Sequence, residues 1–313
     1  MAQAARQSFA SILVCGICIG TLLAACGPLI IPAAAPPAPT ISPASAVPTD
    51  CLPGNHLNRL ETGGTARQYW IYVPGSYRPG KPVPLVLGFH GNTGHADQFE
   101  AYTGFVPVAD KTGFILVYPQ GAGNPPSWDV WQGSKDIQFV SDLIDRLEST
   151  CSIDPARVYA TGHSLGGGMV NRLACDLSDR IAAIGSVSGA YVNAEPCIPA
   201  QPVAVVATHG TADTDVWYGA LPPDGGPPAS HVQMNTPIPQ WAWTWGQRNG
   251  CDKQSKAFFQ KGPVSAQRWA DCREGADVIL YTIQGGQHSW PATTPDFDPA
   301  QLIWDFFAAH PRR

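Results

Sequence analysis

The sequence contains few charged residues and no run of basic ones. Charged side chains make up 14% of the 313 residues, and the formal net charge is −5. Because binding to nucleic acid needs clustered lysine and arginine, nucleic acid is not an expected partner. Internal repeats and a second change of composition after residue 50 are also absent. The sequence therefore predicts one large domain rather than an array of repeats.

Two spacings typical of metal sites are missing as well. After Cys26 there is no Cys-x-x-Cys pair, which argues against a zinc ribbon or a thioredoxin-like redox site. No two histidines are four residues apart, the spacing found on the helices of zinc hydrolases. We therefore expect no metal and no other cofactor. Several histidines are nevertheless expected to gather at one edge of the sheet, namely His90, His95, His163, His209 and His288.

The N-terminal residues resemble an export signal. Arg6 supplies a positive charge, and the apolar stretch from residue 8 to residue 25 is too short to span a membrane comfortably. It ends in Leu23-Ala24-Ala25-Cys26, which resembles the bacterial lipobox, in which the cysteine carries the lipid. We expect a lipoprotein signal peptide over residues 1–25 and a lipid on Cys26. The alternative is an ordinary signal peptide cut nearby, and either signal exports the protein.

The rest of the chain divides into a tether and a globular part. Residues 26–50 are largely Pro, Ala, Ser and Thr, which favours an extended spacer without a core. Residues 51–313 have the composition and length of one α/β catalytic domain. Six cysteines remain in this exported part, so disulfides are expected. Their positions predict three pairs, Cys251–Cys272, Cys175–Cys197 and, as the remaining two, Cys51–Cys151.

Apolar runs that alternate with helical patterns predict the fold. Continuous runs such as Leu85-Val86-Leu87 are typical of strands buried on both faces. Strands are expected at residues 68–73, 84–89, 114–118, 157–161, 182–187, 203–208 and 278–283. Helices are expected at residues 136–148, 165–176, 237–249 and 299–309. This alternation predicts an α/β fold with a mostly parallel central sheet and helices on both faces.

The most specific motif is Gly162-His163-Ser164-Leu165-Gly166. It follows an expected strand and opens an expected helix, the setting of a nucleophile elbow, whose tight turn requires small residues two before and two after the serine. The N-terminus of the helix then favours negative charge near the serine oxygen. The motif predicts Ser164 as a nucleophile. The alternative is a glycine-rich turn with a structural role only.

A serine nucleophile needs a base to remove its proton and a carboxylate to orient that base. In folds with such an elbow the three groups follow in the order Ser, Asp, His, each after a strand. Asp213 follows the expected strand at 203–208, and His288 follows the one at 278–283. Both are predicted to be catalytic. Asp215 is a rival for the acid position, although we expect it to face solvent.

The oxyanion hole and the substrate cleft can also be placed. An oxyanion hole needs two backbone N–H groups. One is expected from Leu165, directly after the serine. The other is expected from Asn92, beside Thr93, in the loop after residues 84–89. Aromatic residues in the flanking loops are candidates for the cleft, with structural anchoring as the alternative. These residues are Trp128, Trp131, Trp217, Tyr218 and Trp290.

In chain order, these motifs resemble the polyhydroxybutyrate depolymerase and feruloyl esterase family of α/β-hydrolases, which is like carbohydrate esterase family 1. The resemblance is carried by His90-Gly91, by residues 154–169 around the elbow, by His209-Gly210-Thr211-Ala212-Asp213 and by Gly285-Gly286-Gln287-His288-Ser289-Trp290-Pro291. It covers nearly all of residues 51–313 and implies the α/β-hydrolase fold, hydrolysis of carboxylic esters, and Asp213 rather than Asp215 as the acid.

Two departures from the family pattern leave the substrate open. Leu165 stands where the family often has Asn, and Val216-Trp217-Tyr218 stands where it often has Val-Pro-Tyr. The resemblance implies feruloylated polysaccharides or polyhydroxyalkanoates as substrates, with acetylated xylan or other short-chain esters as a third option. A lipid tether and the lack of a separate binding module favour the feruloyl type. The alternative of another class is a non-catalytic, polymer-binding surface lipoprotein. We expect a monomer that contacts the membrane only through its lipid.

Overall fold

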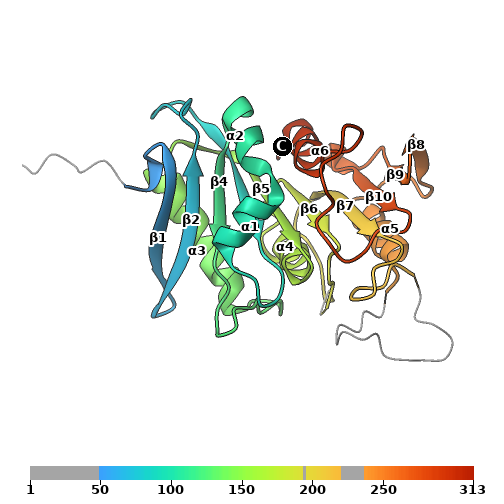
Figure 1. Cartoon of the computed structure of the whole chain (residues 1–313), viewed down its shortest axis with the longest axis horizontal. Helices are drawn as coiled ribbons and strands as arrows, with labels where there is room; N and C mark the ends of the chain where they lie inside the picture. Colours follow the sequence, from blue (N-terminus) through green and yellow to red (C-terminus); the bar gives the residue numbers. More distant parts are fainter. Residues whose placement is uncertain (1–48, 193–194, 220–235) are drawn as a thin grey trace, which may run out of the picture. The chain divides into compact units, whose positions relative to one another are not determined.

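A ten-stranded sheet runs through the part of the chain that the computed structural model describes, residues 49–192, 195–219 and 236–313 (Figure 1). The strand order is β1-β2-β4-β3-β5-β6-β7-β10-β9-β8. The strands are β1 (Gly54–Thr62), β2 (Thr65–Val73), β3 (Val83–Phe89), β4 (Ile115–Pro119), β5 (Ile153–His163), β6 (Ala183–Val187), β7 (Ala204–Gly210), β8 (Lys256–Lys261), β9 (Val264–Trp269) and β10 (Val278–Ile283).

The centre of the sheet is parallel and both of its margins are antiparallel. Strands β4, β3, β5, β6, β7 and β10 pair in parallel with one another. The pairs β1–β2, β2–β4, β10–β9 and β9–β8 are antiparallel. The prediction of a mostly parallel central sheet is therefore confirmed. Because parallel strands end at the same edge, the loops after β3, β5, β7 and β10 lie along one side of the sheet.

Helices cover both faces of the sheet (Figure 1). They are α1 (Ala96–Thr103), α2 (Phe105–Thr112), α3 (Lys135–Thr150), α4 (Leu165–Asp176), α5 (Ile238–Arg248) and α6 (Pro299–Ala309), with short 3-10 helices at Thr49–Cys51 and Arg273–Gly275. One apolar layer is formed with α3, α4 and α5, and the other with α1, α2 and α6. Among the described residues, no helix has the length and apolar character needed to cross a membrane.

The seven expected strands and four expected helices are all present, with ends shifted by a few residues. Strands β1, β8 and β9 and helices α1 and α2 were not expected. β8 is mostly exposed and begins and ends with lysine, and β1 has no fully buried residue until its end, so neither has the apolar run of a central strand. The two helices have only eight residues each and meet at Gly104, which leaves too short a stretch for a helical period to stand out.

Three disulfides join the expected cysteines. They are Cys51–Cys151, Cys175–Cys197 and Cys251–Cys272. The first ties the start of the described domain to the end of α3, where the buried Asp50 also accepts hydrogen bonds from Tyr69 and Arg146. The expected signal peptide, lipidated Cys26 and tether lie outside the described residues.

Candidate active site

The serine motif forms a sharp turn between β5 and α4. Ser164 has φ 55° and ψ −121°, a backbone conformation that residues other than glycine rarely adopt. A Cβ atom at Gly162 would lie 2.3 Å from the carbonyl oxygen of Gly166, and one at Gly166 would lie 2.0 Å from that of Phe89. Both positions therefore require glycine. The tight turn lifts the side chain of Ser164 above the edge of the sheet, as in a nucleophile elbow.

Ser164, His288 and Asp213 form a continuous chain of hydrogen bonds. His288 Nε2 is 2.9 Å from Ser164 Oγ, and His288 Nδ1 is 2.8 Å from Asp213 Oδ2. Because an ionised carboxylate only accepts hydrogen bonds, Nδ1 carries the imidazole proton. Nε2 then presents its lone pair to the serine hydroxyl. The arrangement is that of a nucleophile beside a general base whose tautomer is fixed by an acid.

The carboxylate of Asp213 is buried and fully occupied. Its Oδ1 accepts the backbone N–H groups of Asp215, at 2.9 Å, and Val216, at 2.7 Å. Burial by itself would raise the pKa of Asp213, but hydrogen bonds from His209, His288 and Val216 outweigh it and hold the pKa below its ordinary value. Asp215, the rival candidate, is half-buried rather than exposed, and its backbone supports Asp213. The structure thus brings Asp213 to His288.

The loops that carry the acid and the base touch through their backbones. The N–H of Ala212 donates to the carbonyl of Gly286 at 2.9 Å, and that of Thr211 donates to Ile283 at 3.0 Å. A Cβ atom at Gly210 would lie only 2.2 Å from the carbonyl oxygen of Gly286. The separation of Asp213 from His288 is therefore set by main-chain contact as well as by their side chains.

The two expected oxyanion donors belong to the start of α4 and to the loop after β3. Leu165 is the first residue of α4. A Cβ atom at Gly91 would lie 3.3 Å from Ser164 Cβ, so the loop after β3 passes directly beside the nucleophile. Thr93 donates its N–H to Pro126. In contrast, no described backbone acceptor receives the N–H of Leu165 or of Asn92.

The loop after β4, which contains Gly121 and Trp128, holds the loop after β3 in place. Trp128 donates its indole N–H to the carbonyl of His90 at 2.8 Å, and the N–H of Gly121 donates to His90 Nε2 at 3.0 Å. Burial lowers the pKa of His90, which favours the neutral ring that can accept this bond. The Trp128 ring packs against Phe89 and is only 5% exposed. Trp128, a cleft candidate, is thus an anchor of the loop rather than a cleft surface.

The other cleft candidates differ in their surroundings. Trp290 is buried between Phe99 and Phe105, and its backbone N–H donates to the hydroxyl of Tyr102, so it anchors the His288 loop to α1 and α2. Trp131 is 61% exposed.

Trp217 and Tyr218 are half-buried, and the Tyr218 hydroxyl is 2.7 Å from Thr282 Oγ1. Of the five cleft candidates, Trp131, Trp217 and Tyr218 therefore keep exposed surface. A residue's position in a loop does not show whether its side chain is buried. The predicted cleft residues therefore include buried anchors as well as residues with exposed surface.

Two residues near the triad were not among the predicted site residues. The ring of His163 lies 5.0 Å from that of His288. Burial, together with the charge of His288, lowers the pKa of His163 to about 3, so this ring is neutral at ordinary pH. The ring of Tyr102, a residue that is 51% exposed, lies 6.2 Å from that of His163. His163 occupies the variable position of the serine motif, whereas nothing in the sequence marks Tyr102.

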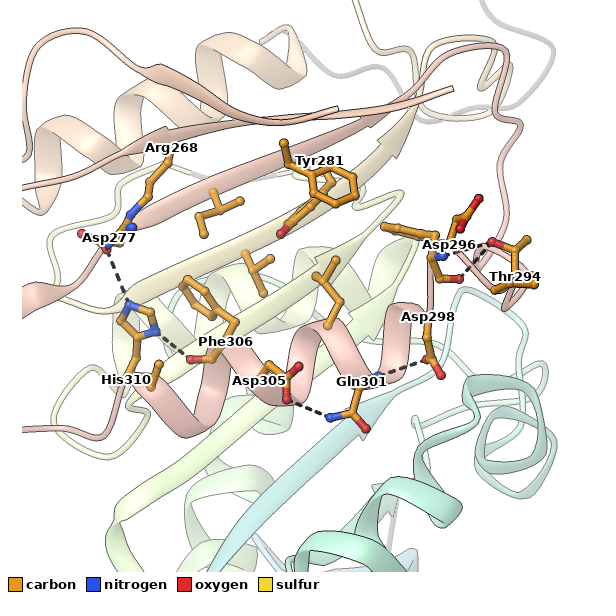
Figure 2. A pocket seen from close by; sticks show the side chains of 17 residues that line it. Arg268, Asp277, Tyr281, Thr294, Asp296, Asp298, Gln301, Asp305, Phe306 and His310 are labelled. Carbon is orange, nitrogen blue, oxygen red and sulfur yellow. Dashed lines mark hydrogen bonds and ion pairs between the residues drawn. The ribbon is translucent and has the colours of Figure 1, made fainter. Parts of the chain in front are cut away.

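Two cavities lie beside strands β7 and β10. One, of about 450 Å³, lies behind the His288 loop and is lined by its neighbours Gln287 and Ser289. The other, of about 550 Å³, lies between α6 and the strands β9 and β10 (Figure 2). It contains a second aspartate–histidine pair, Asp277 and His310, and neither cavity is lined by Ser164. Within the described part of the chain, no group of three His, Cys, Asp or Glu side chains is arranged to hold a metal ion.

The chain is similar in sequence to known esterases. The family described as "Esterase PHB depolymerase" matches residues 68–214. Feruloyl esterase B of Piromyces equi is 29% identical over 252 residues, which are 77% of this chain and 44% of that protein. A bifunctional acetylxylan esterase/xylanase of Neocallimastix patriciarum is 29% identical over 78% of this chain and 33% of that protein. The chain thus spans less than half the length of these two relatives.

A shorter relative and a solved structure match along most of their length. A probable feruloyl esterase C of Aspergillus flavus is 30% identical over 78% of this chain and 84% of that protein. The structure of an acetyl xylan esterase from Aspergillus awamori has a TM-score of 0.60 and 17% identity, over 81% of this chain and 99% of that one, and shares the fold. The chain therefore belongs to the polyhydroxybutyrate depolymerase and feruloyl esterase family of α/β-hydrolases, a family of carboxylic ester hydrolases.

Proposed function

We propose that the protein is an exported serine esterase that acts through an acyl-enzyme. The observation that carries this proposal is the hydrogen-bonded chain Ser164–His288–Asp213. His288 Nε2 takes the hydroxyl proton as Ser164 Oγ attacks the ester carbonyl, and Asp213 stabilises the imidazolium that forms. The imidazolium then gives its proton to the leaving alcohol. A water molecule, activated by the same nitrogen, releases the carboxylic acid and restores Ser164.

The negative charge of each tetrahedral intermediate needs stabilisation near Ser164. The backbone N–H groups of Leu165 and Asn92 are proposed to supply it. Neither has a described backbone acceptor, Leu165 directly follows the serine, and Asn92 directly follows Gly91, which passes beside it. The N-terminus of α4 adds the favourable end of a helix dipole. His90 and Trp128 take no part in the chemistry, but hold the loop that presents Asn92.

The proposed substrate is a carboxylic ester linked to a plant-wall polysaccharide, with feruloyl esters preferred. Relatives of this chain are named feruloyl esterases, and one is named an acetylxylan esterase/xylanase. Exposed aromatic surface at Trp131, together with the half-buried Trp217, suits an aromatic acyl group through stacking worth about 0.5–1.5 kcal/mol per contact. The family description favours hydroxyalkanoate polyesters as the second candidate.

A panel of esters separates these candidates. Purified protein would be assayed with methyl ferulate, 4-nitrophenyl acetate, acetylated xylan and hydroxybutyrate oligomers, and kcat/KM compared. We expect methyl ferulate to exceed hydroxybutyrate oligomers. An advantage of the oligomers greater than about tenfold, equal to ~1.4 kcal/mol of transition-state preference, would reverse the substrate assignment and leave the esterase mechanism intact. Absence of turnover on every ester, with no labelling of Ser164 by a fluorophosphonate, would favour the non-catalytic, polymer-binding alternative.

We further propose that residues 1–25 are a lipoprotein signal peptide, that Cys26 carries the lipid and that residues 26–50 form the tether of a monomeric catalytic domain, residues 51–313. Three disulfides in the described domain support export, because such bonds persist in oxidising compartments. Intact mass of the membrane-bound protein would detect acylation of Cys26. Release of a Cys26→Ala variant into the medium is expected, and its retention on the membrane would contradict the anchor.

A further inference from the structure

His209 is a buried histidine beside the triad to which the mechanism above gives no role. It lies at the C-terminal end of β7 and is 1% exposed. Its Nε2 atom is 2.8 Å from the carbonyl oxygen of Val216 and 3.2 Å from Asp213 Oδ2. The same Oδ2 atom receives the N–H of His288. Two imidazole rings therefore face one carboxylate oxygen.

The surroundings of His209 fix its proton. A carbonyl oxygen can only accept a hydrogen bond, so Nε2 carries the hydrogen that points to Val216. Nδ1 is buried and has no hydrogen-bond partner among the described residues. A second proton on Nδ1 would be a buried N–H without an acceptor, which is unfavourable. The geometry thus directs the Nε2–H of His209 at Val216 and Asp213.

This N–H closes the turn that holds the acid. Val216 accepts from His209 through its carbonyl and donates its own N–H to Asp213 Oδ1 at 2.7 Å. His209 therefore fixes Val216, and Val216 fixes one oxygen of Asp213. The positive end of the His209 N–H also faces the other oxygen, Oδ2, and offsets part of its charge.

We propose that His209 is a positioning residue. It holds the turn from Asp213 to Val216 in place, orients the Asp213 carboxylate toward His288 and offsets part of the negative charge of that carboxylate. The inference rests on the proposed esterase function. The titratable groups that face His209 are Asp213 and Tyr218 on the loop after β7, His288 on the loop after β10 and His163 at the end of β5. Asp213 is the only carboxylate among them.

The test compares His209→Phe, which removes the N–H, with His209→Gln, which retains one. In His209→Phe we expect kcat on 4-nitrophenyl acetate to fall about 10- to 100-fold with little change in KM, less than the ~10⁴-fold expected for losing the orienting acid itself. The acid limb of the kcat/KM profile should move to higher pH. Without the His209 N–H, the negative charge on Asp213 Oδ2 is offset less and stabilises protonated His288 more. His209→Gln should restore most of both properties.

The matched control is His310→Phe. His310 also bonds a backbone carbonyl, that of Phe306, and also faces a carboxylate, Asp277, but it lies directly after α6 in the cavity of Figure 2. Its replacement should leave kcat and the pH profile unchanged. Thermal unfolding of each variant identifies loss of folded protein.

Either of two results would overturn the inference: an acid limb of His209→Phe that stays in place or moves to lower pH, or a His209→Gln variant no better than His209→Phe. If the wild-type protein neither turned over esters nor reacted with a fluorophosphonate, the proposed function would fail. A wild-type protein that is active, beside an unaltered His209→Phe variant, would refute only the role of His209.

Discussion

Two of the aspartate–histidine pairs in the described part of the domain, Asp213–His288 and Asp277–His310, show by their contrast what an imidazole needs to act as a base. In one pair, His288 Nδ1 is 2.8 Å from Asp213, and its Nε2 faces a serine hydroxyl. In the other, His310 Nδ1 donates to the carbonyl of Phe306, and its Nε2 is 3.8 Å from Asp277 (Figure 2). Both carboxylates are buried, and hydrogen bonds lower the pKa of both against the opposing effect of burial.

The difference lies in the third group of each pair. Asp213 is supported by neutral N–H donors, so its negative charge remains available to a protonated imidazole. Asp277 instead forms an ion pair with Arg268, whose cation already balances that charge. The nitrogen of His310 that could act as a base points at the aspartate rather than at a hydroxyl. A low carboxylate pKa and a nearby histidine are therefore insufficient without an unpaired carboxylate and an available nucleophile.

Replacing the nucleophile should have the largest effect on turnover. Ser164→Ala is expected to lower kcat on 4-nitrophenyl acetate on the order of 10⁵- to 10⁶-fold, because the acyl-enzyme can no longer form. His310→Ala, in the second pair, should retain kcat within about twofold. Residual turnover of Ser164→Ala near the wild-type rate would place the chemistry elsewhere in the molecule.

Replacing each aspartate compares the pairs directly. Asp213→Asn should lower kcat on the order of 10³- to 10⁴-fold, because the amide no longer enforces the Nδ1–H tautomer of His288. Asp277→Asn should keep its activity and lose about 1 kcal/mol of stability with the Arg268 ion pair, which is partly exposed. Steady-state kinetics and urea unfolding measure the two effects. Similar losses of kcat in both variants would remove the distinction drawn between the pairs.

Acid should affect the stability contributed by both pairs in the same way. Each aspartate has a lowered pKa in the folded state, so its contribution is complete above the ordinary aspartate pKa of about 3.9 and is lost as the pH falls through the folded value. Asp213→Asn and Asp277→Asn should each reduce the difference in unfolding free energy between pH 7 and pH 3. Asp179→Asn, at an exposed position, is the control. Unchanged pH dependence in either aspartate variant would contradict the lowered pKa of that residue.

The sequence was sufficient for the parts of the molecule with a strict local requirement. The elbow could be predicted because only glycine fits at residues 162 and 166, where a Cβ would meet a carbonyl oxygen. The central strands could be predicted because both of their faces are buried, which requires continuous apolar runs. Asp213 and His288 could be placed because each follows such a strand.

Features that depend on distant partners could not be derived in this way. Trp128 and Trp131 stand three residues apart in one loop, yet one is buried against Phe89 and the other exposed. Tyr102 reaches the His288 loop from α1, a short helix that no periodic pattern marks. The role inferred for His209 depends on a carbonyl seven residues away that the turn brings back to it. In each case the deciding contact comes from tertiary packing.

The backbone contact between Gly210 and Gly286 has a consequence for transplanting this chemistry into another scaffold. The loops that carry Asp213 and His288 contact each other through their backbones, without side chains between them. They therefore form one structural unit, which consists of the ends of β7 and β10 and the residues that follow. Grafting either loop alone would remove the backbone contacts that position it. A bulkier residue at either glycine would push the two loops apart. An engineer can vary the aromatic surface around Trp131 to alter substrate preference, but must move the paired loops together.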